Sequence, residues 1–421
     1  MRSIRLAIGL VLGLSCSAFG QGAQQAAGVP GSLGQASYDP DIFNVRSFGA
    51  AGNGQTDDSA AIASAAAAAV ANSLRGQPSA LYFPAGTYRL VTALPTWTVP
   101  ISVFGEGQER SVIRVDPAFS GDVFSWSDVW MANNYGPRAD TISPLTTQKA
   151  GVEVKGIRIT GNRTSANLQN AFVFYDRADQ VFMRDVDVFD LTGRALYSGV
   201  LRRTTQSYMR ESHFNSLRFV RCGSAGAAAV VDFDSHGNGD TTNEISIDGL
   251  DIVAPGGVGL LLHSSSSKKA IGLMKFARLH VDGQGGGGAA ALVHVGDAAF
   301  AGNSNIDFVQ TELINPPAGF AAIRFTAQSV ATAPFQVRLQ GRIGGEAADG
   351  KGIVIDAGRI LSFDLTELHT RDVNVTVASS KMVRGPIVLD GHGQEASWTR
   401  SIDPSSAAAV ERPVPHALQQ F

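Results

Sequence analysis

The sequence has little cysteine, almost no excess charge of either sign, and few charged residues for its length. Cys16 and Cys222 are the two cysteines among 421 residues, and their separation fits neither a disulfide scaffold nor a zinc ribbon. The 34 basic and 37 acidic residues leave a net charge of −3, which gives no indication of nucleic-acid binding. A hydrophobic share of 44% excludes a wholly disordered chain, and the 47 glycines follow no collagen period. We therefore expect a large folded chain that is rich in glycine.

The N-terminus has the organisation of a secretory signal peptide. Arg2 and Arg5 precede the apolar stretch 6–14, which is too short to span a bilayer, and small residues suited to signal peptidase follow. We expect residues 1–20 to be removed and residues 21–40 to form a flexible lead-in. No later run is apolar for long enough to predict a membrane span. The sequence therefore predicts a secreted or periplasmic protein.

A repeated unit of two short apolar runs occupies the chain after residue 150. Pairs of apolar residues two positions apart recur at intervals of 24 to 34 residues, and a second alternating run follows most of them. The first runs start at Ala171, Ala195, Ala229, Gly259, Ala291, Ala322 and Gly352, and the second cover 181–189, 244–253, 275–281, 305–314, 335–343 and 360–368. Gly or Asn usually marks the bends between the runs. Period-two alternation without helices excludes βαβ units, and the unit is too short for a propeller blade. The pattern predicts a solenoid of parallel strands.

A solenoid exposes unpaired strand edges at its ends, and the sequence offers a cover for the first end. Residues 56–59 read Thr-Asp-Asp-Ser, which is typical of a helix start, and the alanine-rich stretch 60–72 consists of helix formers. The strands 80–83 and 87–91 are predicted to follow. We expect a helical cap over about 57–73.

Three short motifs resemble a known family. The stretch 43–62 (FNVRSFGAAGNGQTDDSAAI), the stretch 81–88 (LYFPAGTY) and the stretch 103–107 (VFGEG) are similar to the first coils of the pectate-lyase-like right-handed β-helix superfamily. The resemblance implies an all-β fold, a single-stranded right-handed parallel β-helix over 41–390, and a carbohydrate ligand. It leaves the reaction open, because the superfamily includes hydrolases, lyases, epimerases and phage tailspikes. We expect an irregular tail over 391–421.

One predicted strand places three titratable side chains together. Along Val231–His236, period-two alternation puts Asp232, Asp234 and His236 on one face and the apolar residues on the other. We expect the two carboxylates and the imidazole to project outward as candidate catalytic residues. The alternative is that these are ordinary solvated charges on an outer face. The Asp-x-His pattern also resembles that of mannuronan epimerases, but it lacks the second Asp that follows the His there.

The preceding segment is rich in arginine. Eight arginines and five acids lie between positions 177 and 221, in a chain that is slightly acidic as a whole. Arginine binds carboxylates through two parallel hydrogen bonds, which suits a uronate sugar. We name Arg210 and Tyr208, predicted on one strand face, as catalytic candidates, and Arg202, Arg203 and Arg218 as substrate-binding candidates. The alternative is that these arginines pair with neighbouring acids.

An insertion over 125–149 interrupts the repeat and carries aromatic residues. Trp126, Trp130 and Tyr135 are candidates for stacking on sugar rings at the wall of a groove. The alternative is that they pack the insertion onto the solenoid.

These residues favour cleavage of an acidic polysaccharide by β-elimination. A lyase needs a cation for the substrate carboxylate, a base and an acid. A glycoside hydrolase using the pair Asp232 and Asp234 is one alternative, and a non-catalytic glycan-binding or surface-structural β-helix is another. No calcium-loop or zinc spacing is present, so no cofactor is predicted, and Ca²⁺ between aspartates of adjacent coils stays an open alternative. The sequence does not indicate an oligomeric state.

Overall fold

The computed structural model describes the chain from residue 40 to residue 389, with gaps. The described residues are 40–129, 151–201, 206–224, 229–237, 242–264, 271–284, 291–296, 304–317, 321–327, 335–344, 351–357, 362–365, 368–370, 375–377 and 387–389. The chain divides into two compact units, and every described residue belongs to the second, Asp39–Phe421. The predicted signal peptide, lead-in up to residue 39 and tail 391–421 lie outside the described residues.

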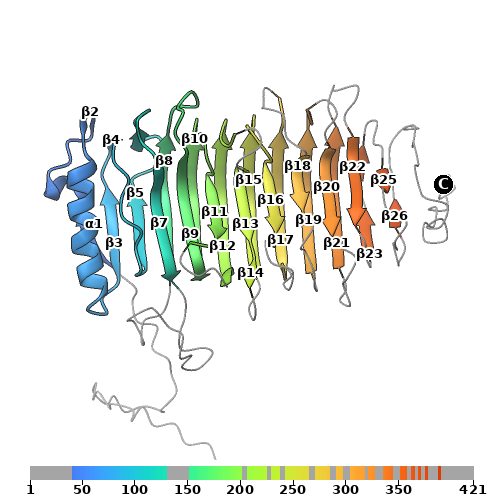
Figure 1. Cartoon of the computed structure of the whole chain (residues 1–421), viewed down its shortest axis with the longest axis horizontal. Coiled ribbons are helices and arrows are strands. Elements are labelled where there is room, and N and C mark those ends of the chain that lie inside the picture. The colour runs from blue at the N-terminus through green and yellow to red at the C-terminus, as the bar shows by residue number, and fades with distance from the viewer. Residues whose placement is uncertain are drawn as a thin grey trace, which may run out of the picture. The chain divides into compact units, whose positions relative to one another are not determined.

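Strands make up most of the described chain, and they follow one another in chain order along the stack (Figure 1). In order, the elements are β1 Asp41–Asn44, the 3₁₀ helix η1 Val45–Phe48, β2 Asn53–Asp57, α1 Ser59–Ser73, β3 Ser79–Phe83, β4 Gly86–Leu90, β5 Ile101–Gly105, β6 Ser111–Val115, β7 Gly121–Val129, β8 Val152–Thr160, β9 Gln169–Asp179, β10 Val181–Phe189, β11 Leu196–Gly199, β12 Gln206–Val220, β13 Val231–Asp234, β14 His236–Gly237, β15 Asn243–Val253, β16 Leu260–His263, β17 Met274–Asp282, β18 Ala291–Val295, β19 Ser304–Ile314, β20 Ala321–Ala327, β21 Phe335–Gly344, β22 Lys351–Ala357, β23 Ser362–Leu365, β24 Leu368–Thr370, β25 Val375–Val377 and β26 Ile387–Leu389.

The strands form two long parallel ladders. The first ladder runs β9–β11–β13–β16–β18–β20–β22–β25, and the second runs β8–β10–β12–β15–β17–β19–β21–β23. Each strand therefore pairs with its counterpart in the next coil, and the short β12–β14 pair is antiparallel. The mostly β, parallel architecture predicted from the repeats is confirmed, and the predicted run 181–189 coincides with β10.

Strands of the second ladder bend in the middle, which the sequence did not predict. In β10 the residue at the bend, Asp185, has a φ of 54° and drops out of the pairing register. Val181 and Met183 before it are buried, and so are Val186 and Val188 after it. The alternation of inward-pointing residues therefore shifts by one position at the bend. One strand thus lines two faces of the coil.

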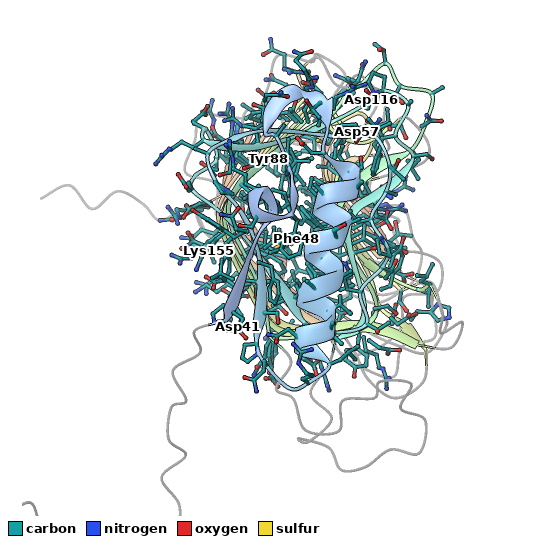
Figure 2. All side chains as sticks on the ribbon, turned by 90° about the vertical axis from the view of Figure 1, so that its left-hand side faces the viewer. Asp41, Phe48, Asp57, Tyr88, Asp116 and Lys155 are labelled. Atoms are coloured by element: carbon teal, nitrogen blue, oxygen red, sulfur yellow. The ribbon has the colours of Figure 1, made fainter. Side chains whose placement is uncertain are left out.

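The helix α1 covers the N-terminal end of the coil (Figure 2). Its buried side is made of Ile62 and small residues such as Ala65 and Ala69, which let the helix approach the first strands closely. Asp57 accepts hydrogen bonds from the Ser59 backbone and hydroxyl at 2.9 and 2.5 Å, and this holds the pKa of Asp57 below its ordinary value. The predicted cap is confirmed. In the part of the chain that the structure describes, no helix has both the length and the apolar character to cross a membrane.

Candidate functional site

The outward face of the first ladder carries a row of polar side chains on successive coils. Tyr197 of β11 lies beside Asp232 of β13, and Asp234 lies beside His263 of β16. Their neighbours Val231 and Phe233 point into the core, so alternation places the polar residues on the outer side. We call Tyr175, Arg194, Tyr197, Asp232 and His263 the ladder cluster.

Asp232 is the centre of the ladder cluster. One carboxylate oxygen accepts a hydrogen bond from Nε of Arg194 at 2.8 Å, and the other lies 3.0 Å from Nε2 of His263. The Asp232 side chain is 3% exposed, whereas those of Arg194 and His263 are 22% and 19% exposed. A buried carboxylate therefore orients a cation and an imidazole that both reach the surface. Charge-assisted hydrogen bonds of this kind fix side-chain geometry strongly.

Two tyrosines extend the ladder cluster. The guanidinium of Arg194 lies 4.3 Å from the centre of the Tyr197 ring, and the Tyr175 ring meets Tyr197 edge-on at 6.0 Å. Burial, followed by the nearby carboxylates of Asp232 and Asp234, raises the pKa of Tyr197 well above its ordinary value. Tyr197 is therefore a protonated phenol at neutral pH and a possible proton donor.

Gly199 makes room for the Tyr197 phenol. A Cβ at position 199 would lie 1.9 Å from the Tyr197 hydroxyl, closer than any non-bonded contact allows. Tyr175 is held from the other side, because its hydroxyl donates to Asp122 of β7 at 2.8 Å. The position of Tyr197 thus depends on a glycine two residues further along its own strand.

The predicted triplet is placed differently from the expectation. Asp232 and Asp234 are 2% and 4% exposed, so the carboxylates do not project into solvent as expected. Strand β13 ends at Asp234, and His236 begins β14, which pairs antiparallel with Ser207 of β12. The alternation that was to place His236 beside the two aspartates therefore stops before it.

Tyr208 and Arg210 lie together, as predicted, but in a buried corner. Arg210 binds Asp179 through two hydrogen bonds of 3.1 and 3.2 Å, and its guanidinium lies 4.5 Å from the Tyr208 ring centre. Both residues are nearly inaccessible, at 1% for Tyr208 and 6% for Arg210. The Arg210 fork is occupied by a protein carboxylate, so the expectation that it grips a substrate carboxylate is wrong.

The other described arginines of the segment also have acid partners, although Arg194 binds Asp232 through Nε and keeps 22% of its side chain exposed. Each of the six described arginines of the segment pairs with an acid: Arg177 with Asp128, Arg184 with Glu153, Arg194 with Asp232, Arg210 with Asp179, Arg218 with Asp251 and Arg221 with Asp190. Arg218 belongs to the second ladder, where it pairs across to β10 and β15, so it does not join the ladder cluster. Arg202 and Arg203 lie outside the described residues.

Trp126 is a core residue, which corrects its prediction as a sugar platform. It lies in β7, is fully buried, and stacks on Phe174 at 4.8 Å with an interplanar angle of 8°. Its indole N–H donates to the Ile101 carbonyl at 2.9 Å. The insertion therefore starts after β7 rather than at position 125. Trp130 and Tyr135 lie outside the described residues.

Four members of the ladder cluster, Tyr175, Arg194, Tyr197 and His263, were not among the predicted site residues. His263 was set aside as a single histidine on a strand, yet it lies 31 residues after Asp232, about one coil of the repeat. Comparing outward positions one repeat apart is the signal that finds this pair. Among the described residues, no group of three or more His, Cys, Asp or Glu side chains is arranged to hold a metal ion.

The family profile described as "Rhamnogalacturonase A/epimerase, pectate lyase-like" matches residues 42–249. No curated protein matches the chain. The matched region contains every residue of the ladder cluster except His263.

Several solved structures have a similar backbone at low sequence identity. ORF18 of Geobacillus virus E2 is 16% identical with a TM-score of 0.47, and the match covers 75% of this chain and 61% of that protein. The A-module of the mannuronan C-5 epimerase AlgE4 of Azotobacter vinelandii is 16% identical with a TM-score of 0.43, covering 82% of this chain and all of the module. The Streptococcus pneumoniae surface adhesin PfbA is 12% identical with a TM-score of 0.38, covering 88% and 76%. The chain thus spans about 61% of the length of the viral protein.

Proposed function

We propose, from the premise that the β-helix of this chain is pectate lyase-like, that the protein cleaves an acidic, uronate-containing polysaccharide by β-elimination. The observation that carries the proposal is the buried Asp232, which holds the surface-reaching side chains of Arg194 and His263 beside the phenol of Tyr197. The cluster supplies a cation, a base and an acid within one patch. β-Elimination at a uronate requires these three groups.

Arg194, His263 and Tyr197 have different roles in the proposed reaction. Arg194 binds the uronate carboxylate and disperses the charge that develops when the adjacent C–H is deprotonated. His263 takes that proton: with Nε2–H donating to Asp232, the neutral ring carries its lone pair on Nδ1. The electron pair forms the C=C bond as the glycosidic C–O bond breaks, and Tyr197 protonates the leaving oxygen. The raised pKa of Tyr197 keeps the phenol protonated until the leaving oxygen, a strong base as its bond to carbon breaks, takes the proton.

Asp234 and His236, two of the catalytic candidates predicted from the sequence, have smaller roles in the proposal. Asp234 lies beside His263 in the ladder, and its backbone carbonyl accepts from the Ser207 hydroxyl at 2.8 Å, so it helps to connect β13 to β12. His236 is a second candidate for proton transfer, since it lies at the start of β14, two residues beyond Asp234. We also propose export to the periplasm or the medium, and right-handed winding, because parallel crossovers are almost always right-handed.

A hydrolase that uses Asp232 and Asp234 has less support. Both carboxylate oxygens of Asp232 are engaged within the protein, one by Nε of Arg194 at 2.8 Å and the other by Nε2 of His263 at 3.0 Å, so neither is directed at a glycosidic oxygen. A non-catalytic glycan-binding β-helix is the second candidate, favoured by the ion pairing of every described arginine in the segment 177–221. Turnover of an acidic polysaccharide distinguishes the proposed lyase from a non-catalytic binding module.

Incubation with a panel of acidic polymers, with ultraviolet detection of the unsaturated product, tests the proposal. We expect His263→Ala to lower turnover by about 10²- to 10⁴-fold, as loss of a general base does. His280→Ala is the matched control, because His280 also pairs with an aspartate, Asp251, at 2.7 Å but on the second ladder. His236→Ala measures the second candidate.

Unchanged activity in His263→Ala together with a large loss in His236→Ala would move the base to β14. Full activity in both variants would contradict the proposed site. Reducing ends without an unsaturated product would indicate hydrolysis, and retention on the polymers without any product would indicate a binding module.

A further inference from the structure

A groove runs along the turns that lead from the second ladder back to the first. It consists of two pockets of about 410 and 380 Å³, and Arg163 lines both of them. The first is formed by the end of β6 and by residues after β6, β8 and β10, and the second by residues after β8, β10, β12 and β15. Coils repeat at ~4.8 Å, so five successive turns give the groove a length of about 20 Å.

The loop that carries Arg163 is held in place by hydrogen bonds to the coils on both sides. The hydroxyl of Ser165 donates to the Pro117 carbonyl at 2.7 Å, and the hydroxyl of Thr192 donates to the Asn167 carbonyl at 2.5 Å. Arg163 therefore stands on a fixed loop between the two pockets. Little ordering is needed when a ligand binds there.

The groove is lined by two arginines, Arg114 and Arg163, and by two acids, Asp116 and Asp190. Its two acids are already paired, Asp116 with Arg89 at 2.7 Å and Asp190 with Arg221 at 2.6 Å. Arg114 donates to the carbonyl of Gly54, and within the described residues neither Arg114 nor Arg163 forms an ion pair with a carboxylate. This contrasts with the arginines of the segment 177–221, each of which has an acid partner where it is described.

We infer that this groove is an accessory binding site for an acidic polysaccharide chain, with Arg163 as the anchor for a carboxylate. Arginine offers a carboxylate two parallel hydrogen bonds, and the wall residues Asn162, Asn167 and Ser224 carry amide and hydroxyl groups that suit sugar hydroxyl groups. The inference rests on the proposed function for the class of ligand. The groove would give the polysaccharide a second contact with the protein besides the ladder cluster. The two are connected through the turn between β10 and β11, which carries Thr192 of the groove and Arg194 of the cluster.

Affinity electrophoresis in gels that contain polygalacturonate, alginate or neutral dextran tests the groove. We expect the wild-type protein to be retarded by at least one of the acidic polymers and not by dextran. Arg163→Gln should weaken that retardation about tenfold, the value of a hydrogen bond to a charged group. Arg184→Gln is the control, because Arg184 is an exposed arginine of the second ladder whose loss leaves the groove intact.

The outcomes separate the groove from the catalytic proposal. Loss of retardation in Arg163→Gln, with retardation kept in His263→Ala, supports the groove whether or not the wild type turns over the polymer. Equal retardation of wild type and Arg163→Gln, an equal loss in Arg184→Gln, or no retardation of the wild type by any acidic polymer overturns it. Turnover that proceeds in Arg163→Gln with unchanged affinity overturns the groove and leaves the proposed function standing.

Discussion

At the residue scale, the corners of the coil are made by glycines and by other residues in left-handed backbone. At the mid-strand bends of the second ladder, Gly156, Gly249 and Gly341 alternate with Asp185, Ser216, Arg278 and Gln310, and thirteen non-glycine residues have positive φ among the described residues. Left-handed backbone costs an L-residue about 1 kcal/mol or more, and β-branched residues tolerate it least. Between the runs, where Gly or Asn was expected, Gln180, Asp190 and Arg221 also have positive φ, because neighbouring strands impose the conformation on other residues.

Substitution at one such corner tests this cost. Gln310 is exposed and has a φ of 54°, so Gln310→Val should lower the free energy of unfolding by about 1–2 kcal/mol. Lys275→Val, at an exposed strand position of the same ladder, should change stability by less than about 0.5 kcal/mol. Urea unfolding of both variants provides the measurement. An equal effect at the two positions would contradict the cost of the corner.

The position of Tyr197 gives a second prediction at this scale. Gly199→Ala must displace the phenol, because the new methyl group would overlap its hydroxyl. Tyr197→Phe keeps the ring and removes only the proton. We expect both variants to fold and both to lose turnover on the acidic polymer, by about 10²-fold or more in Tyr197→Phe. Activity of Tyr197→Phe within a factor of about two of wild type would remove Tyr197 as the acid.

At the element scale, one face of the second ladder carries a row of alternating charges. Register places seven residues side by side across successive strands: Arg158, Asp187, Arg218, Asp251, His280, Glu312 and Arg342. Arg158 lies 2.8 Å from Asp187, and Arg342 lies 3.1 Å from Glu312. Cross-strand pairs of opposite charge favour one register over a slipped one.

His280 makes this row sensitive to pH. Its hydrogen bond to Asp251 at 2.7 Å raises the pKa of His280 above the ordinary value of about 6.5. A raised pKa stabilises the fold fully below that ordinary value, and the contribution is lost as the pH rises through the folded-state pKa. His280→Gln should therefore destabilise the protein more at about pH 5.5 than at about pH 8.5.

Urea unfolding at the two pH values measures this difference. His294→Gln is the matched control, since His294 lies on the first ladder, outside the charged row, and its ring is 3.0 Å from the Thr326 hydroxyl. A His280→Gln effect that is the same at both pH values would contradict the role of the imidazolium.

At the scale of the whole molecule, α1 closes one end of a stack whose strand edges would otherwise be open. Ala69 is fully buried against the first coil, whereas Ala67 faces solvent. Ala69→Glu should lower the free energy of unfolding by about 2–4 kcal/mol, because it buries an unpaired charge, and should promote association through the exposed end.

Ala67→Glu is the control, and it should leave stability within about 0.5 kcal/mol of wild type. Thermal unfolding and size-exclusion chromatography of both variants provide the readouts. A monomeric, fully stable Ala69→Glu protein would show that the first coil does not need its cover.

The sequence alone determined the architecture of this protein, because alternation and helix formation depend on residues close together in the chain. Period-two runs predicted β10 to the residue, and alanine-rich composition predicted α1. The tertiary structure alone decided which polar residues meet, because a partner one coil away lies about 30 residues along the chain. Asp232 reaches His263 and Arg194, Arg210 is taken by Asp179, and Trp126 is buried against Phe174 only when the coils stack in this register. The segment 177–221 shows an excess of arginine, but register decided that each described arginine in it has an acid partner, whereas Arg163, outside that segment, forms no ion pair among the described residues.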